Sequence, residues 1–292
     1  MKKTYPHSLL ALFLMVGLIS YGCASPQKNQ TKSQINKAVP KVESTVTMAT
    51  TTSTQDSGLL DYLLPKFEKQ YKTRVKVVAV GSGQAIETGR RGDADVLLVH
   101  SPADEEKFVK EGQGIDRRNV MHNQFLLIGP TNDPAKVTSA KNVIAAMKAI
   151  ADTKSSFVSR GDASGTNKKE LSLWKTANIT PKGAWYVVSS QGMGETLLMT
   201  NEKQAYTLTD EATYLVQRSK LNLKVVRQGD PELLNPYSVI LVNQAKHPGV
   251  HKDAAQAFAD WVTSENGQNL IADFGKDKYG KSLFIPDAKA GK

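Results

Sequence analysis

The chain has 292 residues, of which 40% are hydrophobic and 23% charged, a composition typical of a globular protein with one large or two modest domains and not of a disordered chain. Its 38 basic and 28 acidic residues leave a formal net charge of +10, which favours anionic partners. Basic residues are not interleaved with aromatic ones, so nucleic-acid binding is not expected. The histidines lack metal-ligand spacing and the folded part has no cysteine, so no zinc site is expected.

The first 23 residues have the layout of an export signal. Lys2 and Lys3 precede an apolar run from Leu9 to Ile19, which is followed by small residues. The run is too short to span a membrane comfortably. A buried N-terminal helix is the alternative interpretation. We therefore expect residues 1–23 to be a signal sequence and the protein to be periplasmic or otherwise extracytoplasmic.

Cys23 is the one cysteine of the sequence and lies at the end of this signal. The exported part therefore has no internal disulfide and depends on its hydrophobic core. The position is similar to the acylated cysteine of a bacterial lipoprotein, with Gly22 before it, although Ser20 and Tyr21 depart from the usual pattern. Cleavage after Ala24 fits as well. Membrane anchoring through a lipid on Cys23 and release into the periplasm both remain open.

The part of the chain after the signal divides into a tether and a folded region. Residues 24–44 are polar and lack hydrophobic periodicity, which predicts a flexible tether. From Thr45, short apolar runs alternate with helical patterns, which predicts an α/β fold with a mostly parallel sheet. The expected strands are residues 46–50, 75–80, 94–99, 123–130, 155–161, 184–190, 205–210, 223–229 and 236–243. The expected helices are residues 58–71, 84–91, 102–112, 140–151, 166–177, 192–204 and 211–219, with further helices in 251–275.

Two similar apolar strands, residues 125–130 and 237–243, bracket a middle segment of about a hundred residues that has its own strands and helices. This arrangement predicts that the chain crosses twice between two lobes, with the two crossings as a hinge. We expect lobe one to comprise residues 45–129 plus 237–292 and lobe two to comprise residues 130–236. A single continuous α/β domain is the alternative.

Three expected strands end in Ser, Thr or Gly and pass directly into a helix, around residues 50–58, 80–86 and 159–170. The first N–H groups of a helix have no intrahelical partner and carry partial positive charge, so such ends bind oxyanions. Any one junction is better explained as a helix N-cap. Three of them, on both sides of the expected hinge, favour a site for a small tetrahedral anion. The strand ends at which they lie are also where ligands bind in open α/β sheets.

The three junctions are rich in hydrogen-bond donors. Arg160, beside the third junction, adds a planar fork of donors and a full positive charge. Glycines allow close approach of the backbone to a ligand. The candidate hydroxyls are those of Thr50, Thr51, Thr52, Ser53, Ser82, Ser164 and Thr166, and the candidate glycines are Gly81, Gly83 and Gly165.

Two other functions would use the same residues. An exported hydrolase would use Ser164 or Ser53, but the sequence lacks the G-x-S-x-G spacing of a nucleophile elbow and nominates no base. The Gly-Lys-Ser/Thr end of a P-loop is also missing. An adhesin would use the Arg-Gly-Asp tripeptide at 160–162, but this tripeptide runs from a strand into a helix and not across a loop tip. We therefore expect a binding protein and no enzyme.

The sequence also resembles a known family. Residues 50–71 (TTTSTQDSGLLDYLLPKFEKQY), 81–85 (GSGQA), 92–102 (GDADVLLVHSP) and 159–175 (SRGDASGTNKKELSLWK) together look like the substrate-binding component of a bacterial tungstate ABC transporter. The resemblance extends from Thr45 to the C-terminus. At the position after Ser-Gly-Thr, where family members often have His, this chain has Asn.

The resemblance implies a two-lobed, type II-like periplasmic-binding-protein fold that closes on one oxyanion. Tungstate is then the preferred ligand, molybdate the competitor and a membrane permease the partner, with a monomeric protein and no cofactor. The ligand residues implied are Thr51, Thr52 or Ser53, Ser82, Arg160, and Ser164 with Gly165 and Thr166.

Physical chemistry alone leaves other oxyanions open. Tungstate and molybdate are bare dianions at neutral pH and need only donors, which hydroxyls, amides and one arginine supply. Hydrogen phosphate carries a proton and benefits from an acceptor, which Asp56 or Asp162 would provide. Sulfate differs from tungstate mainly in size. The preference for tungstate therefore rests on the resemblance.

Overall fold

The computed structural model describes residues 43–288. The expected signal sequence (1–23), the lipidation site at Cys23 and nearly all of the expected tether (24–44) lie outside the described residues. Between residues 43 and 288, no helix has the length and apolar character needed to cross a membrane.

The described chain alternates between strands and helices, as the sequence predicts. The strands are β1 (Thr45–Thr51), β2 (Arg74–Val80), β3 (Val96–Val99), β4 (Gly114–Pro130), β5 (Phe157–Ser159), β6 (Tyr186–Val188), β7 (Thr207–Asp210), β8 (Leu223–Arg227), β9 (Leu234–Val242) and β10 (Ile285–Pro286). The helices are α1 (Thr52–Asp56), α2 (Leu59–Tyr71), α3 (Ser82–Arg90), α4 (Pro102–Lys110), α5 (Val143–Thr153), α6 (Gly165–Thr176), α7 (Met193–Lys203), α8 (Glu211–Gln217), α9 (Lys252–Thr263), α10 (Glu265–Asp273) and α11 (Lys276–Tyr279). Three short 3₁₀ helices are Val137–Ser139, Arg218–Lys220 and Pro231–Leu233.

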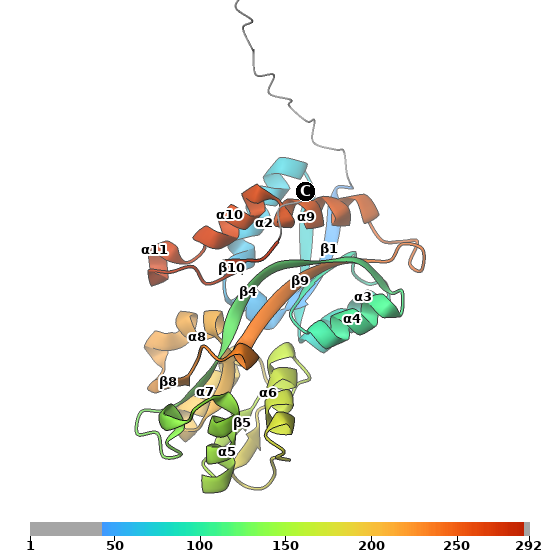
Figure 1. Cartoon of the computed structure of the whole chain (residues 1–292). Coiled ribbons are helices and arrows are strands. Elements are labelled where there is room, and N and C mark those ends of the chain that lie inside the picture. Colours follow the sequence, from blue (N-terminus) through green and yellow to red (C-terminus); the bar gives the residue numbers. More distant parts are fainter. Residues whose placement is uncertain (1–42, 289–292) are drawn as a thin grey trace, which may run out of the picture. The chain divides into compact units, whose positions relative to one another are not determined.

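The main sheet is mixed. Its order is β10-β4-β9-β3-β1-β2, and β7 and β8 pair with the far part of β4 (Figure 1). β1 pairs in parallel with β2 and β3, and β5 pairs in parallel with β6, as expected. The expectation of mostly parallel strands is wrong around β4 and β9, whose pairings in this sheet are antiparallel. The reason is that β4 carries the chain out and β9 carries it back, so two neighbours run in opposite directions.

β4 is longer than the sequence predicts. The apolar residues 123–130 form only its second half, and the strand begins at Gly114 with a polar stretch that includes Arg117 and Arg118. Arg117 pairs with the fully buried carboxylate of Glu105 on α4 at 2.8 Å. Arg118 pairs with Asp260 on α9 at 2.6 Å. Ion pairs with the flanking helices α4 and α9 therefore make a polar segment compatible with a strand.

The buried hydrophobic residues form two groups of clusters. The first group covers both faces of β1, β3 and β9: α2 and α9 contribute Leu63 and Phe258 on one face, and α3 and α4 contribute Ile86 and Phe108 on the other. The second group is built around the end of β4, with α5 and α6 on one side and α7 and α8 on the other. Figure 1 shows the helices of this second group, α5, α6, α7 and α8, around the lower end of the long strands β4 and β9.

Alternation along β4 explains how one strand serves both sides of the second group. Phe125 and Leu127 belong to the cluster with α5 and α6, whereas Leu126 and Ile128 belong to the cluster with α7 and α8. Successive side chains of a strand point to opposite faces, so four consecutive apolar residues fill two cores. Earlier in the same strand, Val120 and Met121 belong to the first group. β4 therefore links the two groups of clusters.

Candidate functional site

Hydrogen bonds bring the three predicted junctions together. The backbone N–H of Gly165, at the start of α6, donates to Ser82 Oγ at the start of α3 over 3.1 Å. Arg160 Nη2 donates to Thr52 Oγ1 on α1 over 2.9 Å. These residues are 83 and 108 positions apart in sequence. The third junction therefore contacts both of the others, and the three junctions together form one candidate site.

The first junction is a compact set of hydroxyl groups. Thr51 caps α1 by accepting a hydrogen bond from the N–H of Thr54 at 3.3 Å, and its hydroxyl oxygen lies 3.1 Å from Ser53 Oγ. Thr51 and Ser53 are buried, and Thr52 is half-buried. Thr50 differs from the other candidates because its hydroxyl donates to the Leu98 carbonyl within the sheet at 2.7 Å. Thr50 is therefore part of the sheet and not of the donor set.

The second junction contributes Ser82 and two glycines. Ser82 is fully buried, and because its oxygen accepts from the Gly165 N–H, its own hydrogen is left to donate elsewhere. A Cβ at Gly83 would lie 3.2 Å from the Ala163 carbonyl oxygen. A Cβ at Gly81 would lie 3.6 Å from the Asp162 carbonyl oxygen. The backbone of the second junction therefore packs directly against the turn before α6, which explains the small residues there.

The third junction contains the observation that points most directly to a ligand. Ser164 caps α6 by accepting from the Asn167 N–H at 3.2 Å, as the helix-cap interpretation predicts. Thr166, two residues further, is 1% exposed, and its hydroxyl has no hydrogen-bond partner within residues 43–288. Leaving a buried hydroxyl unpaired costs about 1–3 kcal/mol. A polar group bound at this helix N-terminus would satisfy it.

Arg160 is buried in the site with its charge already partly paired. It is 3% exposed, and its Nε lies 2.9 Å from Asp162 Oδ2 and donates to the Gln191 carbonyl at 3.3 Å. Asp162 also accepts from the Ser164 N–H at 3.1 Å. Both carboxylate oxygens of Asp162 therefore have donors of their own within the chain. Asp162 orients the guanidinium. It is a weaker candidate acceptor for a protonated ligand than the sequence suggests, because both of its oxygens already have donors.

Asp56, the other acidic residue considered as an acceptor, is exposed at the end of α1. Partial desolvation and the nearby charge of Glu195 raise the pKa of this carboxyl, and the charge of Arg160 opposes that shift. Asp56 therefore lies within the electrostatic field of the candidate site.

His100 is a component of the site that sequence reasoning missed. It follows β3 directly, is 3% exposed and stacks on Tyr237 with ring centroids 4.6 Å apart. Its Nδ1 lies 2.9 Å from Asn235 Oδ1, and the Asn235 amide donates to Asn123 Oδ1 at 2.7 Å. Asn235 therefore presents its oxygen to His100, which places the ring hydrogen on Nδ1. His100 Nε2 is then an acceptor, and it faces Ser53 Oγ at 3.4 Å.

His100 is neutral at pH 7 and lies at the meeting point of the junctions. Burial is the main cause that lowers its pKa to about 4, and the positive charge of Arg160 acts in the same direction. A Cβ at Gly165 would lie 2.9 Å from the His100 ring, so glycine is needed for the close approach of α6. The sequence signals for His100 are its place at the end of a predicted strand and within residues 92–102, one of the four stretches that carry the family resemblance.

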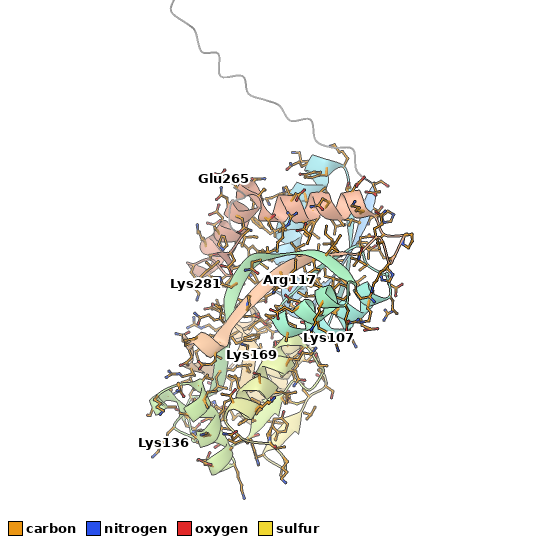
Figure 2. All side chains as sticks on the ribbon, turned by 45° about the vertical axis from the view of Figure 1, so that its right-hand side comes forward. Lys107, Arg117, Lys136, Lys169, Glu265 and Lys281 are labelled. Carbon is orange, nitrogen blue, oxygen red and sulfur yellow. The ribbon has the colours of Figure 1, made fainter. Side chains whose placement is uncertain are left out.

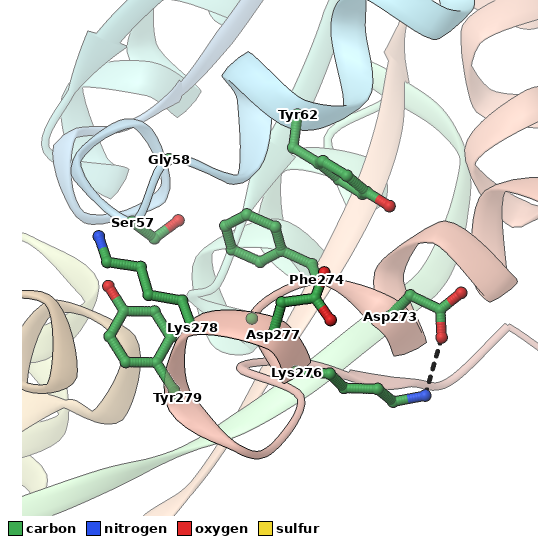
Figure 3. A pocket seen from close by; sticks show the side chains of 10 residues that line it. Ser57, Gly58, Tyr62, Asp273, Phe274, Lys276, Asp277, Lys278 and Tyr279 are labelled. Carbon is green, nitrogen blue, oxygen red and sulfur yellow. Dashed lines mark hydrogen bonds and ion pairs between the residues drawn. The ribbon is translucent and has the colours of Figure 1, made fainter.

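Two surface pockets border the site, and the hydroxyl groups of the candidate residues do not line either of them. One, of about 570 Å³, is lined by Ser57, Tyr62, Phe274 and residues of α11, and it lies between the start of α2 and the C-terminal helices (Figure 3). Another, of about 400 Å³, is lined by His100, Gly165 and Lys169. Of these three side chains, Figure 2 labels Lys169. In the described part of the chain, no group of three His, Cys, Asp or Glu side chains is placed to hold a metal ion.

Comparison with known proteins agrees with this architecture. A family model described as the PBP superfamily domain matches residues 27–266. Tungstate-binding protein TupA of Peptoclostridium acidaminophilum is 47% identical over 283 residues, which is 96% of this chain and 98% of that protein. The chain belongs to this tungstate-binding family of the PBP superfamily. The resemblance of the four sequence motifs is thereby confirmed.

Solved structures of family members have the same fold. The tungstate ABC transporter structure from Geobacter sulfurreducens is 48% identical, covers 80% of this chain and 100% of its own, and has a TM-score of 0.73. TupA from Desulfovibrio alaskensis G20 is 45% identical, covers 85% and 100%, and has a TM-score of 0.72. The expected PBP-type α/β fold is confirmed, with the correction that its sheet is mixed. The family is one of periplasmic substrate-binding proteins, named for binding and transport and not for catalysis.

Proposed function

We propose that this protein binds one bare tetrahedral dianion, with tungstate preferred and molybdate as competitor, between α1, α3 and the N-terminus of α6. The observation that carries the proposal is the buried hydroxyl of Thr166 at the start of α6, which has no hydrogen-bond partner among residues 43–288, within a site that also buries Arg160. The relatives named as tungstate-binding proteins support the choice of ion. The proposed ligand residues are Thr51, Thr52, Ser53, Ser82, Arg160, Ser164, Gly165 and Thr166.

The chemistry of the site favours an anion without a proton. Its hydroxyls, backbone N–H groups and guanidinium are donors, whereas both oxygens of Asp162 already have donors in Arg160 and Ser164. Hydrogen phosphate would bring an additional donor and find few free acceptors. Tungstate and molybdate need only donors, so the site suits them better. Sulfate is also a bare dianion and is distinguished by its size.

We further propose that the molecule closes around the anion by a hinge motion. Lobe one would comprise residues 45–129 plus 237–292 and lobe two residues 130–236, with β4 and β9 as the crossings. The two groups of hydrophobic clusters support this division, although Ala212 of α8 packs in the first group. The hydrogen bonds of Gly165 with Ser82 and of Arg160 with Thr52 would then be contacts of the closed form.

The remaining parts of the proposal concern delivery. A monomeric protein would act outside the cytoplasm, either anchored through a lipid on Cys23 or released after cleavage, and pass the anion to the permease of an ABC transporter. Mass spectrometry of the membrane and periplasmic fractions distinguishes the two forms. A diacylglycerol adduct on an N-terminal Cys23 indicates anchoring, and an unmodified N-terminus beyond Ala24 indicates release.

A panel of oxyanions tests the binding proposal. Ligands that bind the folded state raise the melting temperature, by an amount that grows with the ratio of concentration to Kd. We expect the largest shift with tungstate, a similar one with molybdate, and smaller ones with sulfate and phosphate. Absence of any shift at millimolar concentrations of all four would contradict the proposal. A larger shift with phosphate or sulfate would assign the site to that ion.

One geometric feature favours a second candidate function, hydrolysis. Covalent hydrolases use a nucleophile, a base and a residue that orients the base. Here these places would be taken by Ser53 Oγ, His100 Nε2 and Asn235. The 3.4 Å contact is long, Ser53 is 1% exposed, and a pKa of about 4 makes His100 a weak base. Ester turnover that disappears in Ser53→Ala would support hydrolysis. Tungstate binding without any turnover supports the binding function.

A further inference from the structure

A buried carboxylate lies behind the proposed anion site. Glu170, on α6, is 2% exposed and accepts hydrogen bonds from four side chains, none of them charged. Its Oε1 accepts from Trp174 Nε1 at 2.9 Å and from the Tyr186 hydroxyl at 2.7 Å. Its Oε2 accepts from Ser159 Oγ at 2.6 Å and lies 3.5 Å from Asn167 Nδ2. One oxygen therefore faces the aromatic core, and the other faces the turn before α6.

Asn167 connects this carboxylate to the backbone of that turn. Its Nδ2 donates to Ser159 Oγ at 3.3 Å, and its Oδ1 accepts from the Ala163 N–H at 3.2 Å. The side chain is 5% exposed. Because Glu170 accepts and cannot donate when ionised, it directs the Ser159 hydroxyl and the Asn167 amide nitrogen toward itself. The amide oxygen is then fixed toward Ala163.

The turn needs such support because its backbone is unfavourable. Gly161 and Ala163 have φ of +67° and +57°, and for an L-residue other than glycine this region costs about 1 kcal/mol or more. Arg160 precedes this stretch and Ser164 follows it. A relaxed turn would change both the aim of the guanidinium and the position of the α6 N-terminus.

We propose that Asn167 and Glu170 are positioning residues for the anion site. Glu170 orients the Asn167 amide through Oε2, and Asn167 holds the turn in the conformation that directs Arg160 and the start of α6 at the ligand. Neither side chain touches the anion. This inference rests on the proposed function.

The two oxygens of Glu170 provide a matched comparison. Asn167→Leu keeps the approximate volume of the side chain. It removes both the amide nitrogen that faces Ser159 and Glu170 and the amide oxygen that accepts from Ala163. Ser159→Ala removes only the hydroxyl between Glu170 and Asn167, with almost no change in volume. Tyr186→Phe removes a hydrogen bond to the same carboxylate from the core side and removes no hydrogen bond of Asn167 or Ala163. We expect all three substitutions to lower the free energy of unfolding. Only Asn167→Leu and Ser159→Ala should alter the turn before α6.

The test is the tungstate Kd and dissociation rate of the full exported protein, measured together with its urea unfolding. We expect Asn167→Leu to weaken binding about tenfold and Ser159→Ala about threefold, mainly through faster dissociation, and Tyr186→Phe to stay within about twofold of wild type. Asn167→His at pH 8, with one donor and one acceptor on its neutral ring, should recover affinity relative to Asn167→Leu.

Three results would contradict the positioning role or the function on which it rests. Unchanged affinity in both Asn167→Leu and Ser159→Ala would overturn the positioning role. If Tyr186→Phe lost as much affinity as Asn167→Leu and Ser159→Ala, Glu170 would act only through the general stability of the protein. That result would also overturn the positioning role. A wild-type protein that binds none of the four oxyanions would instead remove the proposed function on which the inference rests.

Discussion

The two sides of the proposed anion site differ in construction. The side formed by α1 and α3 supplies neutral hydroxyls, some of which already bond to one another, such as Thr51 with Ser53 at 3.1 Å. The side formed by the turn before α6 has a buried guanidinium, backbone in the left-handed region and the buried hydroxyl of Thr166. Within residues 43–288, the Thr51 hydroxyl has hydrogen-bond partners, whereas the Thr166 hydroxyl has none. The anion should therefore stabilise the second side more, and affinity should be more sensitive to changes there.

The largest expected effect concerns His100, which lies where the two sides meet. Its folded-state pKa of about 4 is below the unfolded value of about 6.5, so the unfolded chain binds the proton more readily between these pH values. The contribution of the neutral ring to stability is complete above pH 6.5 and is lost as the pH falls to 4. At about 1.4 kcal/mol per unit, the loss amounts to roughly 3 kcal/mol.

Urea unfolding of wild type and His100→Gln at several pH values measures this contribution. Other groups titrate in both proteins, so the informative quantity is the difference between their unfolding free energies. We expect the unfolding free energy of wild type to fall by about 3 kcal/mol more than that of His100→Gln between pH 7 and pH 4. A difference that is independent of pH would show that His100 is not buried as a neutral ring.

Arg160→Ala tests the charged side. Loss of a charge-assisted hydrogen bond to the anion should weaken tungstate binding by about 1.5–3 kcal/mol, or roughly 10- to 150-fold, by isothermal titration calorimetry. Thr51→Ala on the neutral side is the comparison, with an expected loss of binding nearer 1 kcal/mol. An unchanged affinity in Arg160→Ala would remove this residue from the site. An equal loss in both variants would remove the distinction between the two sides.

Gly165→Ala tests whether the sides must approach as closely as they do. The new Cβ would lie 2.9 Å from the His100 ring and from its carbonyl oxygen, and the carbonyl cannot move independently of the backbone. Overpacking of this kind costs about 1–3 kcal/mol, which we expect to appear as weaker tungstate binding. Gly229→Ala is not an equivalent control because Gly229 has a φ of +82°. Gly249→Ala is suitable, since its Cβ meets no atom within 4 Å and its φ is not in the left-handed region.

Sequence reasoning located the local parts of this arrangement. Strand ends followed by Ser, Thr or Gly are local signals, and Ser164 and Thr51 do cap α6 and α1. The parts that it missed depend on partners far away in the chain. Arg118 lies in the polar first half of β4, where it pairs with Asp260 on α9, 142 residues further along the chain. His100 lies in one of the four family-like stretches, but its role depends on Asn235, 135 residues further along the chain.

The smallest expected effect is also the most specific to the ligand. Thr166→Val replaces the hydroxyl with a methyl group of similar size. Because that hydroxyl has no partner in the described chain, its removal should leave the stability of the ligand-free protein unchanged or slightly higher. Tungstate binding should weaken by about 0.5–1.5 kcal/mol, since the anion loses one donor. Most substitutions of buried polar residues lower stability and affinity together, so a loss of affinity alone would identify Thr166 as a group held unsatisfied for the ligand. A loss of stability with unchanged affinity would instead assign its hydroxyl to the folded protein, and the second side of the site would then resemble the first.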